Sequence, residues 1–296
     1  LGLPEQHAVA VSSGTAALFM ALWALKAEKK SVAIPVYACS ALRNAIGLAH
    51  AEEILVDIEK ESPNICLDSV RKSNADIVIA PHLFGLPIDL KELNNIDIIE
   101  DCAQSLGASV GEVPVGLQGK IGVFSFYATK LITSGGQGGM LVSKDKLLID
   151  AVRDYRDFDC RSDSKFRFNF QMTDLQASIG RVQLKKLPYF LERRTEIFNM
   201  YQDAGLNLLQ ETSSKYHSVK YRAVIKTKKA RTIIYYLNKK NIKLIVPIED
   251  WELLGAPIFF KNALNLTHET VSLPIYPNLS DEEVKRIIAN ILYILQ

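Results

Sequence analysis

The stretch that decides the fold is residues 96–130, IDIIEDCAQSLGASVGEVPVGLQGKIGVFSFYATK. It begins with a run typical of a buried strand, residues 96–100, and a carboxylate, Asp101, follows where that strand ends. A second strand is expected at 121–127, and Lys130 lies just beyond it. In open α/β sheets, binding and catalytic residues gather at the carboxyl ends of strands. We therefore expect Asp101 and Lys130 to meet at one edge of a sheet.

An aspartate and a lysine brought together in this way suit the cofactor pyridoxal 5′-phosphate (PLP). In such sites a lysine bonds to the cofactor's aldehyde, and an acidic residue holds the proton on the pyridine nitrogen. Gln104 follows Asp101 by about one helical turn, so both side chains can face one ligand. Ser125, Thr129 and Lys130 cluster at the end of the next strand. The residues thus predict a PLP site; the alternative for Lys130 is a solvated surface lysine.

Apolar runs in the first part of the chain alternate with helical patterns. The runs expected to be strands are residues 8–11, 32–34, 54–56, 76–80 and 140–143. Continuous apolar strands separated by helices are typical of a largely parallel sheet covered on both faces. A capping box at residues 173–176 opens a helix expected to run to about residue 201, with a kink at Pro188.

The pattern changes after Gly205. A strand at 221–225, a helix at about 230–240 and a stretch at 243–247 indicate a smaller α+β domain, and a capping box at 280–283 opens a C-terminal helix. We predict a large domain over residues 1–203 and a small domain over residues 204–296.

A helix start near the N-terminus is a candidate anion site. Ser13, Gly14 and Thr15 stand between the first strand and a helix-forming run. Free N–H groups at such a start, with the positive end of the helix dipole, suit a phosphate. The alternative is that Ser13 and Thr15 only cap the helix. His82, also at a strand end, is interpreted as structural, because a lone histidine is more often structural than catalytic.

Composition excludes several classes of partner. The net charge of +2, from 35 basic and 33 acidic residues, gives no reason to expect nucleic acid or a membrane surface. The four cysteines have no metal-site spacing, so no metal is predicted, and reduced thiols favour a cytoplasmic protein. No run approaches the ~20 apolar residues of a membrane span.

Several ordered motifs resemble one known family, the DegT/StrS family of PLP-dependent nucleotide-sugar aminotransferases. They are SSGTAAL (12–18), EDCAQSLGA (100–108), SFYATK (125–130), GQGGM (136–140), FNFQMTDLQASIGRVQLKKL (168–187) and SLPIYPNLSDEEV (272–284). The resemblance implies an α/β protein of PLP-dependent transferase fold type I. Its large domain would hold a mostly parallel seven-stranded sheet, beside a small C-terminal α+β domain. It also implies a homodimer with shared active sites.

The resemblance assigns roles to individual residues. Lys130 would bond to PLP and move the proton between substrate carbon and cofactor carbon, Asp101 would pair with the pyridine nitrogen, and Gln104 would contact the phenolic oxygen. The phosphate-binding residues would be Gly14, Thr15 and Ser125, joined by Asn169 reaching into the neighbouring subunit.

Two of the departures from the family pattern bear most directly on the site. Cys39 stands where the family often stacks an aromatic residue on the cofactor ring, so either its thiol packs there or Tyr37 compensates. The longer leader that precedes the first motif in the family is absent from this sequence, which therefore looks truncated at its N-terminus.

We expect a ping-pong aminotransferase for sugar or polysaccharide biosynthesis. Glutamate or glutamine would aminate the cofactor, which would then aminate a keto sugar on a nucleotide diphosphate. One alternative is a PLP-dependent sugar dehydratase, although that group has histidine in place of Lys130. Another is a degenerate homologue that binds PLP or a partner without turnover.

Overall fold

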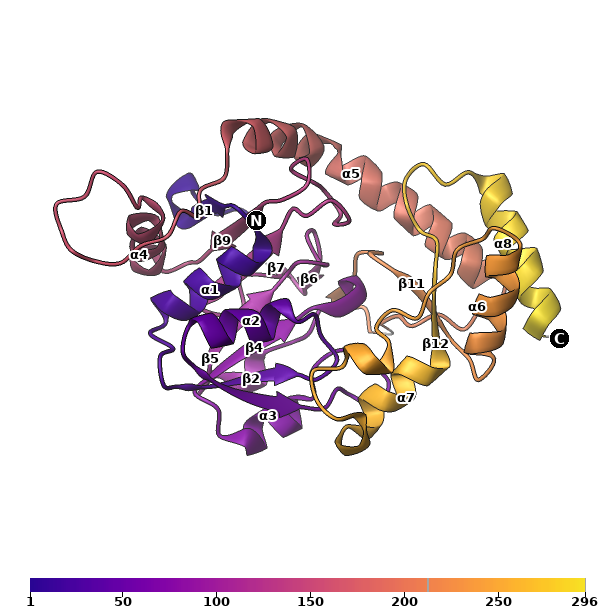
Figure 1. Ribbon diagram of the computed structural model, residues 1–296. Coiled ribbons are helices and arrows are strands. Elements are labelled where there is room, and N and C mark those ends of the chain that lie inside the picture. Colours follow the sequence, from indigo (N-terminus) through magenta and orange to yellow (C-terminus); the bar gives the residue numbers. More distant parts are fainter. Residues whose placement is uncertain (212, 296) are drawn as a thin grey trace.

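A seven-stranded sheet lies at the centre of the molecule in the computed structural model, which describes residues 1–211 and 213–295 (Figure 1). In spatial order its strands are β1 (Ala8–Val11), β9 (Gly139–Val142), β8 (Ile121–Ser125), β5 (Asp97–Asp101), β4 (Ile77–Pro81), β2 (Ser31–Pro35) and β3 (Glu52–Val56). The five strands from β8 to β3 pair in parallel, whereas β9 runs antiparallel to both of its neighbours. The predicted mostly parallel sheet is confirmed.

Both faces of this sheet are buried, as the continuous apolar strands predict. Successive side chains of a strand point to opposite faces. In β4, Ile77 and Ile79 join the core beneath α1 (Gly14–Ala24), α2 (Ala41–Leu48) and α4 (Lys146–Arg156), while Val78 and Ala80 join the core beneath α3 (Leu67–Ser73). This two-sided covering leaves the strand ends as the open edge of the sheet.

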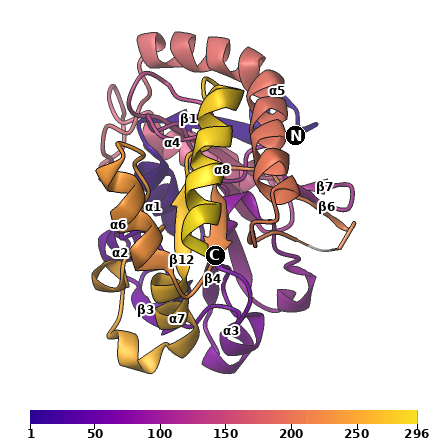
Figure 2. The same ribbon diagram turned by 90° about the vertical axis from the view of Figure 1, so that its right-hand side faces the viewer.

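The C-terminal part is built on a second apolar core. Its hairpin, β11 (Ala223–Lys226) paired with β12 (Thr270–Leu273), packs with α6 (Ala230–Lys239), α8 (Asp281–Leu295) and the end of α5 (Asp174–Asp203) (Figures 1 and 2). Figure 2 shows α5 changing direction along its length, as a proline inside a helix predicts. The domain boundary after residue 203 stays a prediction.

The remaining elements are short. A small sheet joins β10 (Tyr216–His217), β6 (Ser109–Val110) and β7 (Val113–Pro114), and α7 (Lys261–Glu269) precedes β12. The 3-10 turns are η1 (Glu5–His7), η2 (Leu83–Gly85), η3 (Lys91–Leu93), η4 (Asp250–Glu252) and η5 (Pro257–Phe259). None of the helices in the described ranges is long and apolar enough to cross a bilayer.

The stretch at 243–247 forms a single bridge, between Ile245 and Ser272. Pro247 has no N–H to continue a ladder there.

Candidate active site

A cleft of about 820 Å³ opens at the carboxyl ends of β4, β5 and β8 and is closed on its other side by residues of the C-terminal part. All of the predicted site residues except Asn169 line it: Gly14, Thr15, Cys39, Asp101, Gln104, Ser125 and Lys130. Asp101 and Lys130 therefore share one cleft at the strand ends, as the strand-end rule predicts.

Asp101 is the last residue of β5 and faces this cleft. One carboxylate oxygen, Oδ1, accepts the N–H of Ala103 at 2.9 Å. Burial raises the pKa of Asp101, and the Ala103 hydrogen bond and the Lys130 charge only partly oppose that rise. A cationic ring nitrogen beside the carboxylate would supply the missing stabilisation of the charged form.

Lys130 follows β8 and is half-buried in the wall of the cleft. Its backbone N–H donates to the Tyr127 carbonyl at 2.9 Å, which fixes the turn that carries it. The ammonium Nζ lies 5.7 Å from the centroid of the Tyr221 ring and, within the described residues, has no carboxylate or hydrogen-bond partner. Lys130 thus lines the cleft with an amine that is unpaired among the described residues, and its role as the cofactor lysine stays a prediction.

The start of α1 has free donors facing the cleft. Ser13 caps the helix by accepting the N–H of Ala16 at 3.0 Å, as the capping interpretation predicts. In the part of the chain that the structure describes, the N–H groups of Gly14 and Thr15 donate to no protein acceptor. A Cβ on Gly14 would lie 2.8 Å from that of Ser125, so the turn and the serine leave room only for glycine. This cradle fits a phosphate group.

Gln104 is held by Phe84, in the turn that follows β4. Its Oε1 accepts the N–H of Phe84 at 2.8 Å, so the amide NH₂ of Gln104 is left as a donor at the cleft. Phe84 itself has φ of 60°, in the left-handed region. A bulky residue is strained there, and such strain is concentrated at functional sites.

These donors, the buried carboxylate and the free amine fit PLP, and comparison with known proteins agrees. The sequence profile of the DegT/DnrJ/EryC1/StrS aminotransferase family matches residues 2–292. The chain belongs to this family. The predicted enzyme class, a PLP-dependent aminotransferase, is thereby confirmed.

Three known proteins show the extent of the similarity. The chain is 28% identical to a GDP-perosamine synthase of Vibrio cholerae, over 96% of this chain and 85% of the relative. It is 30% identical to a GDP-perosamine synthase of Escherichia coli O157:H7, over 94% of this chain and 83% of the relative. The PMP form of Spr1654 from Streptococcus pneumoniae superposes with a TM-score of 0.88 at 23% identity, over 96% of this chain and 86% of that one. The fold prediction is confirmed by such neighbours.

The departure at Cys39 is now easier to interpret. Cys39 is exposed and lines the cleft of this aminotransferase, whereas Tyr37 is fully buried, with its ring 6.3 Å from that of Phe84 in an edge-to-face arrangement. The thiol, and not the Tyr37 ring, therefore stands at the position where the family often has an aromatic side chain.

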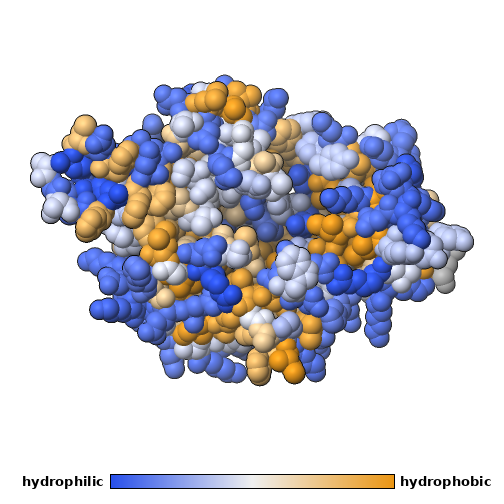
Figure 3. All heavy atoms as spheres, viewed as in Figure 1, coloured by the Kyte–Doolittle hydropathy of each residue, from blue (hydrophilic) through white to orange (hydrophobic). Residues whose placement is uncertain are grey.

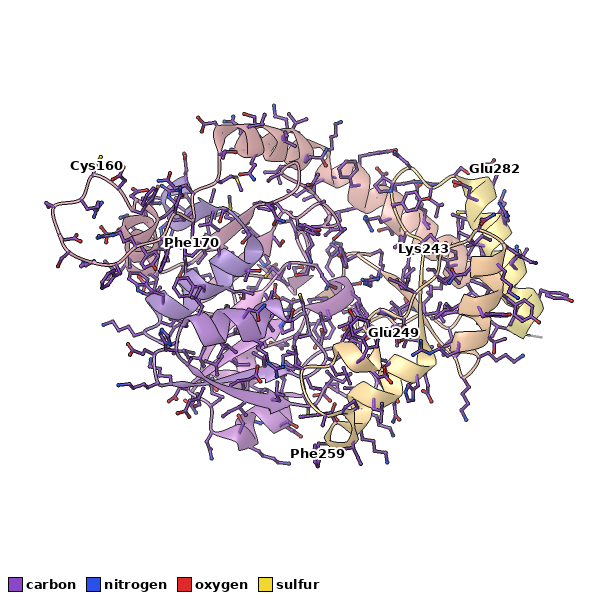
Figure 4. All side chains as sticks on the ribbon, in the orientation of Figure 1. Cys160, Phe170, Lys243, Glu249, Phe259 and Glu282 are labelled. Atoms are coloured by element: carbon purple, nitrogen blue, oxygen red, sulfur yellow. The ribbon has the colours of Figure 1, made fainter. Side chains whose placement is uncertain are left out.

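Asn169 lies outside the cleft of its own chain. Phe170 packs on Phe19 and Tyr155 and accepts the N–H of Ser12 at 2.7 Å, which ties the end of the loop before α5 to the body (Figure 4). The neighbouring Asn169 is left exposed. Its predicted role in a partner's site stays a prediction.

Sequence reasoning did not find the partner of His82. The Nδ1 of His82 accepts the N–H of Ile88 at 3.1 Å, so the ring proton is on Nε2, which donates to Glu100 at 3.0 Å. Glu100 also accepts the N–H groups of Gly116 and Gly119 at 2.8 and 2.7 Å. His82 is thus structural, as interpreted. The grouping of His82, Glu100 and Cys102 within 4.8 Å is explained by these bonds.

Replacing Glu100 by glutamine is expected to lower the free energy of unfolding by about 3 kcal/mol, because an amide presents donors where backbone donors already point. Burial acts to raise the pKa of Glu100, but His82 and the loop N–H groups outweigh it and lower that pKa. The stabilisation is therefore present above the usual glutamate range and is lost as pH falls through the lowered pKa. Urea unfolding at several pH values measures both effects.

The matched control is Glu92→Gln, at an exposed carboxylate that pairs with Arg71. Exposed pairs contribute about 0–1 kcal/mol. If the Glu100 variant lost no more stability than the Glu92 variant, the structural role of Glu100 would be wrong.

Two arginines in the cleft wall were also missed. Arg43 donates to both oxygens of Glu53, at 2.8 and 2.6 Å. Arg222 precedes β11 and donates from Nη1 to the hydroxyl of Ser272 at 3.0 Å. Nothing in the sequence marks either residue, because each reaches the cleft only through long-range packing.

Proposed function

We propose that this aminotransferase moves an amino group from glutamate or glutamine to a keto sugar carried on a nucleoside diphosphate. One observation carries the proposal: three groups line the same cleft. Among the described residues, they are the unpaired Lys130 amine, the Asp101 carboxylate, and the backbone N–H groups at the start of α1 that have no protein acceptor. The names of the relatives, two of them GDP-perosamine synthases, support a nucleotide-sugar substrate.

Each residue of the cleft has a part in this proposal. When bound, PLP supplies an electron sink for breaking the C–H bond beside the transferred nitrogen. Lys130 attaches the cofactor and then takes and returns the proton at Nζ. Asp101 keeps the ring nitrogen protonated, and the NH₂ of Gln104 donates to the ring oxygen. The remaining contacts, to the phosphate and the ring face, come from Gly14, Thr15, Ser125 and Cys39.

Isotope transfer tests the proposal directly. The protein, loaded with PLP, is given glutamate or glutamine labelled at the transferred nitrogen together with a panel of nucleoside-diphosphate keto sugars. We expect the label in an amino sugar, detected by mass spectrometry. Label that never leaves the amino acid, with every sugar of the panel, would argue for the non-catalytic alternative.

We also propose a homodimer with shared sites. The first half of α5 exposes Leu175, Ile179, Val182 and Leu184, and Figure 3 shows an apolar patch along the edge of the molecule where α5 lies. Asn169 is exposed on the segment that leads into this helix. A second copy covering α5 would bury the apolar surface and bring Asn169 towards the partner's phosphate cradle.

Mixing two defective variants checks this arrangement, at a PLP concentration that leaves Asn169→Ala largely without cofactor. Lys130→Ala and Asn169→Ala proteins each have two defective sites as homodimers. In a mixed dimer, one site combines the native lysine of one chain with the native asparagine of the other, so subunit exchange should restore activity. Mixing Lys130→Ala with Asp101→Asn is the control. Both residues line one chain's cleft, so each site of that mixed dimer keeps one defect and activity should not be restored.

The activity of each mixture is compared with that of its two parent variants, and the PLP affinity of each variant is measured separately. Asn169→Ala alone should weaken PLP binding, by about 10-fold for one lost hydrogen bond to a charged group. If the Lys130→Ala and Asn169→Ala mixture regained no activity above its parents after refolding together, the shared site would have to be abandoned.

A further inference from the structure

We propose that Arg222 binds the α-carboxylate of the amino donor, and so restricts the donor to α-amino acids. This inference rests on the proposed function and assigns it a donor subsite. Arg222 lies in the wall of the cleft that Asp101 and Lys130 also line, immediately before β11.

The guanidinium of Arg222 is held in a fixed orientation. Its Nη1 donates to the hydroxyl of Ser272 on β12, at 3.0 Å. The guanidinium carbon lies 6.0 Å from the ring centroid of Phe84 and 5.8 Å from that of Tyr221. Aromatic neighbours and one hydrogen bond orient the group without neutralising its charge.

The remaining edge of this guanidinium has no acceptor. Within the described residues, Nε of Arg222 is buried without a hydrogen-bond partner and Nη2 donates to no protein atom. Arg43, the other arginine of the cleft, is already paired with Glu53. A buried donor without an acceptor is unfavourable, and a carboxylate fits an arginine edge with two parallel hydrogen bonds. The cleft therefore holds one cation prepared for an anionic ligand besides the phosphate cradle.

Position distinguishes a donor carboxylate from the diphosphate of the sugar substrate. Lys130 Nζ and the Arg222 guanidinium lie beside the same Tyr221 ring, at 5.7 and 5.8 Å from its centroid. In an α-amino acid the carboxylate carbon is two bonds from the nitrogen that must replace Lys130 at the reacting carbon. In a nucleotide sugar aminated at C3 or C4, the sugar ring separates the diphosphate from that carbon. An arginine that approaches the same aromatic ring as the lysine suits the amino acid.

The arginine is also linked to the cofactor pocket through a strained residue. The carbonyl of Phe84 accepts the N–H of Arg222 at 3.4 Å, while the N–H of Phe84 donates to Gln104 at 2.8 Å. Phe84 keeps its left-handed backbone between these two bonds. The left-handed backbone thus helps to fix the Phe84 ring relative to Gln104, and the Arg222 guanidinium lies near that ring.

The test compares Arg222→Gln and Arg222→Lys with wild type in the PLP-loaded protein. The absorbance band of lysine-bound PLP should be unchanged, which shows that the variants fold and hold the cofactor. The L-glutamate concentration for half-maximal conversion should rise by about 10- to 100-fold in Arg222→Gln. The half-maximal glutamate concentration of Arg222→Lys should lie between those of wild type and Arg222→Gln, because lysine keeps the charge but not the bidentate geometry. Arg231→Gln, at an exposed arginine paired with Glu249, is the matched control.

Two probes separate the α-carboxylate from other effects. Glutarate, which cannot react, should bind wild type and lose about 10- to 100-fold in affinity by calorimetry in Arg222→Gln. 4-Aminobutyrate lacks the α-carboxylate, so its conversion should be slow in wild type and little changed in the variant. Unchanged glutamate and glutarate dependence, or an equal loss for glutamate and 4-aminobutyrate, would overturn the assignment.

Failure of the proposed function has a different signature. If no amino acid converts the PLP-loaded wild type, amino transfer is wrong, and the glutarate comparison alone still decides whether Arg222 binds a carboxylate. If no keto sugar accepts nitrogen while glutamate conversion follows Arg222 as expected, the donor subsite stands and only the acceptor has been misassigned.

Discussion

Lys130→Ala is expected to lose amino transfer by about 10⁴-fold or more, because one side chain provides both the covalent attachment of the cofactor and the proton transfer. The amine has no partner within the described residues and points into the cleft beside Tyr221. Removing it takes away no ion pair, so the fold should survive. The absorbance band of lysine-bound PLP should be absent, and single-turnover conversion with glutamate measures the loss of rate.

A control and a rescue make this result specific to Lys130. Lys144→Ala removes an exposed lysine outside the cleft and should keep both the band and the rate. Small primary amines in the buffer should restore part of the proton transfer to Lys130→Ala, but not its covalent attachment. A variant that kept the band would show that another amine holds the cofactor.

The main features of the site were predictable because they depend on local patterns. Asp101 and Lys130 each follow an apolar strand, and parallel strands end at one edge of the sheet, so two separate stretches of sequence already predicted one site. The capping boxes at Thr173 and Ser280 were likewise readable, since each needs only residues three apart.

The features that were not predicted depend on distant residues. Glu100 is bound by N–H groups of the loop that follows it, and a strand pattern does not specify which buried position will meet that loop. Arg222 is oriented by Ser272, which is far along the chain, and by a ring whose backbone is left-handed. The stretch at 243–247 also depends on distant residues, because its one bridge is made to β12. Tertiary context decided each of these cases.

Asp101→Asn is expected to lower activity but to raise the stability of the cofactor-free protein. The amide cannot hold the ring proton by charge, so the conversion of PLP by glutamate should fall by about 10²- to 10⁴-fold while lysine-bound PLP still forms. In wild type, PLP affinity should decline as pH falls through the pKa of Asp101, which burial raises above the usual aspartate range. In Asp101→Asn, PLP affinity should not show this decline at low pH. Absorbance titrations with PLP across pH measure both.

Without PLP, the Asn variant is expected to be more stable than wild type at neutral pH. Because the folded-state pKa of Asp101 is raised by burial, the contribution of this group to stability is greatest below its unfolded pKa and is lost as pH rises through the folded value. A neutral amide avoids that loss, so at neutral pH the Asn variant should unfold at higher urea than wild type when both lack PLP. Adding PLP should favour wild type, because only wild type offers the cationic ring a carboxylate. A variant that was less stable without PLP and equally active with it would show that Asp101 serves the fold and not the cofactor.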